Sequence, residues 1–305
     1  MENTFKKAVR EEVGVIVGLV GPSGSGKTFS AMRLASGIVG DGSRFAVIDT
    51  ESRRALHYAD RFNFDHCEIH APFRPDTYAS AIQAAVKAGY KAIVVDSCSH
   101  EWAGEGGVLD WQEVELTRMA GDNYQKREAC KMAAWIKPKM SHKQMVQKML
   151  QVNAHLILCF RAEEKTKMAK DANGKTQIIP IGWQPICSKE MPYELAISML
   201  LSPEHPGVPI PIKLEEQHKP FFDLSAPLTE ESGKRIAAWG KGAKTSNAAR
   251  ATADQLRKIS ELYKGYTPDD IIFSCVQVIG HDIKTGSDMT FDEAAMVIAN
   301  KEKVA

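Results

Sequence analysis

The segment Gly21–Thr28, which reads Gly-Pro-Ser-Gly-Ser-Gly-Lys-Thr, constrains the fold of this 305-residue chain more than any other feature. It follows the apolar run 13–20, which has the length of a buried strand, and it precedes the segment 28–39, whose apolar residues recur at helical spacing. A glycine-rich turn of this pattern directs backbone N–H groups and the positive end of a helix dipole toward phosphate. We therefore expect a phosphate-binding loop (P-loop) formed by Gly21, Pro22, Ser23, Gly24, Ser25, Gly26, Lys27 and Thr28.

Two side chains of the loop and one later carboxylate predict the ligand. Lys27 is expected to reach the β- and γ-phosphates of a nucleotide, and the Thr28 hydroxyl is expected to ligate Mg²⁺. The apolar run 92–95 ends at Asp96, as in a Walker B site, where a carboxylate beside the P-loop strand holds Mg²⁺ through its water shell. The alternative for Asp96 is a turn-forming residue after a strand. The expected cofactors are ATP and Mg²⁺.

Glu51 is the candidate general base. It ends the segment Ala-Val-Ile-Asp-Thr-Glu, just past an apolar run, at the sheet edge where open α/β folds bind ligands. A carboxylate at this edge can orient and deprotonate an attacking water. On residues alone, an exposed glutamate that starts a helix explains the position equally well.

Strand-like and helical patterns alternate through most of the chain. The strand-like runs are 13–20, 44–50, 92–96 and 155–160. Alternation of this kind predicts an α/β fold with a mainly parallel sheet and helices on both faces. The segments 193–201 and 209–222 resemble two further strands and predict an antiparallel extension of that sheet.

Three parts of the chain are expected. Residues 1–228 form the core, and the composition changes at about Thr229. Residues 229–251 include a stretch with three basic residues and no acidic one, which is typical of a linker. Residues 252–305 are expected to be a small helical module, because helix start signals occur at Thr252, Thr267-Pro268 and Thr290.

The segment 131–152 has two features that bear on its packing. Ser141 and Gln144 form a capping-box pattern, which predicts a helix from residue 141 to Val152. Four methionines recur in the segment, namely Met132, Met140, Met145 and Met149. We expect them in the core; the alternative is an adaptable binding surface.

Composition and charge limit the remaining possibilities. The chain has 39 basic and 38 acidic residues, so a nucleic-acid site must be a local patch or be shared between subunits. The six cysteines include no Cys-x-x-Cys pair, which favours reduced thiols over a zinc site or disulfides. Met1–Glu12 lacks the apolar run of a signal peptide, and no stretch has the ~20 apolar residues needed to cross a bilayer. We expect a cytoplasmic protein that does not enter membranes.

The P-loop, the segment FAVIDTESRRALHYAD and the segment KAIVVDS together resemble the RecA-like core ATPases. The resemblance implies that Glu51 is the catalytic base. A closer resemblance is to the phage-encoded RecA-like ATPases, which include the Sak-type single-strand-annealing recombinases. It rests on Asp96–Asp110, which contains SHEWAGEGGVLD, and on Ala154–Arg161. The matching segments span residues 13 to about 222.

Two residues of the active site follow only from this resemblance. RecA-type proteins carry a glutamine at the end of the fourth core strand, where it senses the γ-phosphate, and this chain has Arg161 there. Arginine can contact the γ-phosphate but cannot act as the same neutral switch. RecA-like filaments also receive a cation from a neighbouring subunit. The segment 212–222 loosely resembles the strand that supplies it, so Lys219 is the candidate and Lys213 the second choice. The alternative for Lys219 is an exposed hairpin residue.

RecA-like recombinases line their DNA path with two loops, which correspond here to residues 97–122 and 162–183. The second segment offers cations that neutralise phosphates and an aromatic, Trp183, for stacking; the cations are Lys165, Lys167, Lys170 and Lys175. A solvated lysine-rich hairpin is the alternative. The first segment is acidic, and its His100 and Trp102 are as well explained by packing as by ligand contact.

The preferred function is a RecA-like ATPase that binds single-stranded DNA in phage recombination or annealing. Homo-oligomerisation is expected, a single-strand binding protein is a conceivable partner, and a phage-encoded protein would act in the host cytoplasm. Two alternatives stay open. One is a small-molecule P-loop kinase, for which no arginine-rich lid segment is found after the core; the other is a nucleotide-dependent assembly protein that does not touch DNA.

Overall fold

The structure is a computed structural model that describes residues 13–170, 176–242, 251–279, 283–289 and 291–302. The described residues form two compact units, one that ends at Lys241 and one that follows it. Lys175 and Thr290, which the sequence analysis singled out, lie outside the described residues.

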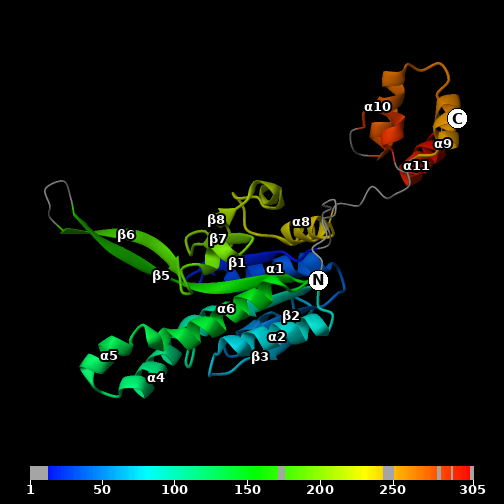
Figure 1. Ribbon diagram of the computed structural model, residues 1–305. Coiled ribbons are helices and arrows are strands. Elements are labelled where there is room, and N and C mark those ends of the chain that lie inside the picture. The colour runs from blue at the N-terminus through cyan, green and yellow to red at the C-terminus, as the bar shows by residue number, and fades with distance from the viewer. Residues whose placement is uncertain (1–12, 171–175, 243–250, 280–282, 290, 303–305) are drawn as a thin grey trace, which may run out of the picture. The chain divides into compact units, whose positions relative to one another are not determined.

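The larger unit contains one mainly parallel sheet with the strand order β3-β2-β4-β5-β1-β7-β8, and β6 pairs with β5 outside this path (Figure 1). Strands β1 to β5 and β7 run parallel to their neighbours in the sheet, whereas β8 and β6 are antiparallel to β7 and β5. The strands are β1 (Ile16–Gly21), β2 (Phe45–Asp49), β3 (Phe64–Glu68), β4 (Ala92–Asp96), β5 (His155–Lys170), β6 (Thr176–Pro185), β7 (Ile197–Leu201) and β8 (Pro209–Leu214). The expected α/β class and antiparallel extension are confirmed.

Helices cover both faces of this sheet and create two hydrophobic cores. Strand β1 is buried throughout, with Val17 and Leu19 in one core and Ile16 and Val20 in the other. This is why its sequence is continuously apolar rather than alternating. The first core is closed by α1 (Lys27–Val39) and α8 (Glu230–Gly240), and the second by α2 (Pro75–Lys87) and α6 (Ile136–Leu150).

Shorter elements connect these layers. The segment 97–122, expected as a loop, is largely helical. The connecting elements are η1 (Arg54–Tyr58), α3 (Ser99–Ala103), α4 (Val108–Ala120), α5 (Tyr124–Cys130), η2 (Ala133–Trp135), α7 (Met191–Glu194) and η3 (Glu216–Phe221).

Strands β5 and β6 form a hairpin that extends beyond the sheet (Figure 1). The first part of β5, up to Arg161, pairs with β1, and the part from Ala162 to Lys170 pairs with β6. Most of the segment 162–183 is therefore paired strand rather than the expected loop.

Helix α8 corrects the expected linker. It occupies residues 230–240 of the segment 229–251 and packs against α1, so the linker prediction is wrong for that part. Glycines permit the close contact: a Cβ atom on Gly37 would lie 1.9 Å from the Glu230 carbonyl oxygen, and one on Gly233 would lie 2.2 Å from that of Leu34. Arg33 adds a two-pronged ion pair to the Glu230 carboxylate.

The smaller unit is helical, as expected. It contains α9 (Ala253–Leu262), α10 (Pro268–Ile279), η4 (Gly286–Asp288) and α11 (Phe291–Glu302) around a core that includes Tyr263 and Cys275. Thr252 and Gln255 form the expected capping box, and Pro268 is the first residue of α10. In the described parts of both units, no helix combines the length and apolar character needed to cross a membrane.

Candidate nucleotide-binding site

The P-loop connects β1 to α1 at the carboxyl edge of the sheet. Gly24 and Gly26 have φ values of 82° and 84°, a left-handed conformation that glycine adopts at little cost. A Cβ atom on Gly21 would lie 2.4 Å from the Leu201 carbonyl oxygen. The Ser25 hydroxyl donates to the Pro22 carbonyl oxygen at 2.9 Å and closes the turn. The loop therefore requires its glycines for backbone shape and close approach.

Lys27 and Thr28 are the first two residues of α1. The Lys27 ammonium donates to the Pro22 carbonyl oxygen at 2.8 Å, so it is held over the loop. Burial lowers the pKa of Lys27, although nearby carboxylates, Asp96 among them, oppose this shift. The Thr28 hydroxyl donates to Asp96 Oδ2 at 2.5 Å. The hydrogen bond between Thr28 and Asp96 thus connects the P-loop directly to the end of β4.

The position of β4 differs from the expectation in one respect. Asp96 ends β4, but β5 lies between β4 and the P-loop strand β1, so the two strands are not adjacent. The Thr28–Asp96 contact nevertheless forms because α1 begins above the sheet edge. Asp96 is 6% exposed, and burial raises the pKa of its carboxyl group while the Thr28 hydrogen bond opposes that rise.

Thr28 and Asp96 fit a magnesium ion. A hydroxyl and a carboxylate are oxygen ligands of the kind that Mg²⁺ prefers, and Mg²⁺ completes its shell with water and substrate phosphates rather than with a protein cage. The described residues contain no cluster of three or more His, Cys, Asp or Glu side chains that could hold a metal alone.

Glu51 is placed by a tight turn after β2. Asp49 is buried, and its two carboxylate oxygens accept hydrogen bonds from Glu51 N at 2.6 Å and Ala55 N at 3.0 Å. Ser52 and Arg53 follow with φ values of 56° and 66°, an uncommon conformation for residues other than glycine. The turn fixes Glu51 at the sheet edge, which favours a site residue over an exposed helix start.

Arg161 and His100 lie beside Glu51. Glu51 Oε1 is 3.7 Å from Arg161 Nε and 3.8 Å from His100 Nε2. Arg161 stands at the point where β5 leaves the sheet, and its backbone N–H donates to Ser99 Oγ at 2.8 Å. Sequence reasoning left His100 between packing and ligand contact, because its partner Thr50 is distant in the chain.

The hydrogen bonds around His100 define its tautomer. Arg161 Nη1 lies 3.3 Å from His100 Nε2, and since an arginine only donates, Nε2 must be an acceptor. The ring proton is then on Nδ1, which donates to Thr50 Oγ1 at 2.9 Å, and the Thr50 hydroxyl donates to the Ser97 carbonyl oxygen at 3.0 Å. Burial lowers the pKa of His100, and the Arg161 guanidinium adds to this shift while the Glu51 carboxylate opposes it. His100 thus positions Arg161 next to Glu51.

Residues of the P-loop line a cleft of about 270 Å³ together with Glu51, Asp96 and Arg161. Phe29 and Tyr58 add aromatic walls, with their ring centroids 5.9 Å apart. The polar groups in the lining are Ser23, Lys27, Thr28, Asp49, Glu51, Arg54, Asp96 and Arg161. The structure therefore brings together the phosphate-binding, metal-binding and general-base candidates on a single surface.

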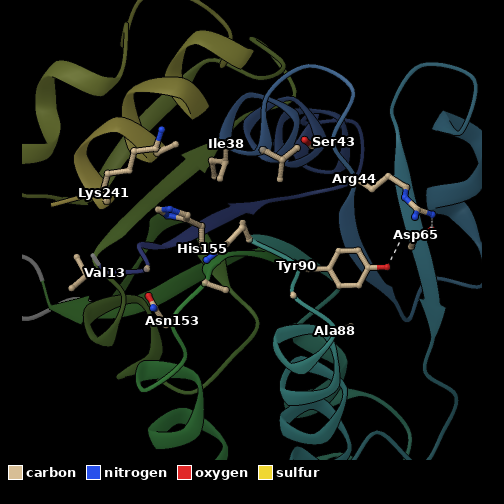
Figure 2. Close-up of a pocket in the computed structure, with 17 residues that line it drawn as sticks. Val13, Ile38, Ser43, Arg44, Asp65, Ala88, Tyr90, Asn153, His155 and Lys241 are labelled. Atoms are coloured by element: carbon tan, nitrogen blue, oxygen red, sulfur yellow. Dashed lines mark hydrogen bonds and ion pairs between the residues drawn. The ribbon is translucent and has the colours of Figure 1, made fainter. Parts of the chain in front are cut away.

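A larger cavity, of about 550 Å³, lies at the opposite edge of the sheet, where the strands begin (Figure 2). Its walls include Val13, His155 and Lys241, and on one side Tyr90 and Arg44 both bind the Asp65 carboxylate (Figure 2). Ligands of open α/β sheets bind at the carboxyl ends of the strands. The smaller cleft is thus the candidate site.

The remaining predicted residues are not in the cleft. Pairing across the hairpin places Lys165 and Lys167 on one face and Lys170 on the other, and Lys165 pairs with Glu163 at 3.1 Å. Lys219 lies on η3 rather than on a strand, because β8 ends at Leu214, and its ammonium binds Glu216 at 2.6 Å.

Comparison of the sequence with known proteins identifies the family to which the nucleotide-binding site belongs. No curated protein matches the chain. A family model described as an AAA domain matches residues 14–198, which run from just before β1 into β7 and include the P-loop, Glu51 and Asp96. The match covers more than half of the 305 residues, and the fold is that of a P-loop NTPase core. The chain therefore belongs to this family of AAA domains, which are P-loop ATPases.

Proposed function

We propose that this protein binds ATP with Mg²⁺ and hydrolyses it at the P-loop cleft. The observation that carries the proposal is the convergence of Lys27, Thr28, Asp96 and Glu51 on one cleft from three separate chain segments. Family membership supports nucleotide binding in general, and the geometry supports the assignment of roles.

Each side chain has a distinct role in the proposed reaction. Lys27 neutralises charge on the β- and γ-phosphates, while Thr28 and Asp96 hold Mg²⁺. The ion, when bound, neutralises charge that develops on the phosphate oxygens. Glu51 orients a water molecule and accepts its proton. Arg161 is held beside Glu51 and can stabilise charge on the transferred group.

We further propose that hydrolysis serves single-stranded DNA in phage recombination or annealing, in a homo-oligomer that can work beside a single-strand binding protein. The support is the resemblance in Asp96–Asp110 and Ala154–Arg161, together with a projecting hairpin that carries exposed lysines. Lys165 and Lys167 share one hairpin face and are the first candidates there for phosphate contact. Lys219, exposed on η3, is the candidate cation for a neighbouring subunit's γ-phosphate.

The experiment is ATP turnover by the full chain, with and without single-stranded DNA, across a salt series. We expect turnover that requires Mg²⁺ and rises with DNA at low salt, because phosphate contacts weaken as salt increases. Lys27→Ala is the matched control for contaminating ATPases. Turnover that DNA does not alter at any salt concentration would reject the DNA part and leave the ATPase part standing.

A further inference from the structure

We propose that a second cleft, on α6, is a binding site for single-stranded DNA; this inference rests on the proposed function. The α6 cleft has a volume of about 340 Å³, and its lining includes Trp102, Lys139, His142, Lys143, Glu190 and Glu194. It contains none of the residues that line the nucleotide cleft.

Helix α6 supplies the charge. Its sequence Ile-Lys-Pro-Lys-Met-Ser-His-Lys-Gln-Met-Val-Gln-Lys-Met-Leu contains four lysines and no acidic residue. Lys137 pairs with Glu115 at 3.3 Å, whereas Lys139 and Lys143, one helical turn apart on the cleft wall, form no ion pair within the described parts of the chain. Cations without a carboxylate partner on the protein favour an anionic ligand such as a phosphate backbone.

Trp102 supplies an aromatic surface. Its ring is half-buried and is held edge-to-face against His142, with the centroids 5.3 Å apart, and nearly parallel to Trp135 at 6.3 Å. The Lys139 ammonium lies 5.2 Å from the Trp135 ring centroid, so a cation and the paired indoles are close together. A cation next to an aromatic ring is the combination that binds the backbone and stacks a base of a single strand.

A buried hydrogen-bond network fixes the floor of the cleft. His142 Nδ1 lies 2.9 Å from Glu101 Oε1, and His142 Nε2 lies 3.1 Å from Ser188 Oγ. Glu101 is 2% exposed and Ser188 is 5% exposed. The network ties α3, α6 and the segment after β6 to one another, so the cleft has a defined shape before any ligand binds.

The wall opposite α6 is acidic. Glu190 and Glu194 line that side and would repel a phosphate there. The backbone of a bound strand is therefore expected along Lys139 and Lys143, with its base turned toward Trp102 and the carboxylates. Carboxylates accept hydrogen bonds from exocyclic amino groups of bases, which suits this orientation.

The test measures binding of a fluorescently labelled single-stranded oligonucleotide to the full chain by anisotropy at a series of salt concentrations. The variant Lys139→Gln/Lys143→Gln should bind more weakly, and the slope of log affinity against log salt should flatten by about 1.4, or about 0.7 for each lost phosphate contact. The control Lys126→Gln/Lys148→Gln removes the same charge from exposed positions outside the cleft and should keep the wild-type slope. The thermal midpoint of each variant checks its fold.

A second measurement reports on the indole. Unlabelled oligonucleotide should quench tryptophan fluorescence in the wild type, and Trp102→Phe should lose most of that quenching. A wild type that binds no single-stranded DNA would reject the DNA part of the proposed function. A wild type that binds DNA, with an unchanged slope in Lys139→Gln/Lys143→Gln or an equal loss in the control, would overturn the α6 site alone. Equal competition by polyglutamate would overturn its nucleic-acid assignment.

Discussion

The Thr28 hydroxyl donates to Asp96 Oδ2 at 2.5 Å, although strand β5 separates the strand that leads into the P-loop from the strand that ends in Asp96. The contact joins the first turn of α1 to the end of β4. It brings two oxygen ligands suited to Mg²⁺ together at one point beside the phosphate-binding loop.

Replacing Lys27 by alanine should abolish ATP binding. Lys27 is the ammonium group held over the P-loop, and neutralising phosphate charge is its expected role. Titration with a fluorescent ATP analogue measures the affinity. Lys87→Ala, which removes an exposed lysine at the end of α2, is the matched control and should bind as the wild type does. Equal affinity in the Lys27 variant would remove the P-loop assignment.

Replacing Asp96 by asparagine should chiefly remove the dependence of nucleotide binding on Mg²⁺. The substitution keeps the size of the side chain and its ability to accept from Thr28, but it removes the negative charge that holds the ion. ATP affinity measured with Mg²⁺ and with EDTA gives the two values to compare. A variant whose affinity still rises with Mg²⁺ as in the wild type would return Asp96 to a structural role.

The lowered pKa of His100 predicts a stability that depends on pH. An unperturbed histidine titrates near pH 6.5, so below about this value the unfolded chain binds more protons at this position than the folded chain does. The free energy of unfolding should therefore fall as the pH falls from about 6.5 through the lowered pKa. The imidazole of His218, also lowered in pKa by burial, adds a similar contribution.

Urea unfolding of variants at pH values from about 5 to about 8, which span the titration of an ordinary histidine, separates the contributions of the two residues. His100→Phe should flatten the pH dependence and also lower ATP turnover, because phenylalanine offers Arg161 no acceptor. His218→Gln should flatten the pH dependence but leave turnover unchanged. Normal turnover in the His100 variant would contradict the positioning role.

Complementation tests the proposed contribution of Lys219 from a neighbouring subunit. Lys219→Ala and Glu51→Gln proteins should each be inactive alone, and a mixture should regain partial turnover, because one partner supplies Glu51 and the other supplies Lys219. Lys213→Ala, at the second candidate position, is run in parallel. A Lys219→Ala protein that hydrolyses ATP normally by itself would eliminate this residue as the donor.

The sequence predicted the P-loop and the strands on either side of the site because these signals are local. Glycines at left-handed positions and a continuously apolar strand are readable without the rest of the chain. The order of strands is not a local property, which is why β4 was expected beside β1. The contact between α1 and α8 was missed for the same reason, since the close approach at Gly37 and Gly233 joins two segments that are far apart in the chain.

Three further details could be learned only from the structure. The hairpin contains a register shift, because Lys165 pairs with Gly182 and Thr166 pairs with Pro180, which leaves Ile181 as an extra residue in β6. Helix α6 begins at Ile136 rather than at Ser141, because Pro138 lies in its first turn, where proline is tolerated. The methionines of this segment divide between environments: Met145 and Met149 are in the core, as expected, whereas Met132 and Met140 are 79% and 56% exposed.

The central claim is that Glu51 activates water for ATP hydrolysis in the P-loop cleft. Replacement of Glu51 by glutamine preserves the size of the side chain and removes its ability to accept a proton. ATP affinity of the Glu51→Gln protein should therefore match that of the wild type, while steady-state turnover should fall by at least about 10². A Glu51→Gln protein that binds ATP and hydrolyses it at nearly the wild-type rate would contradict the account.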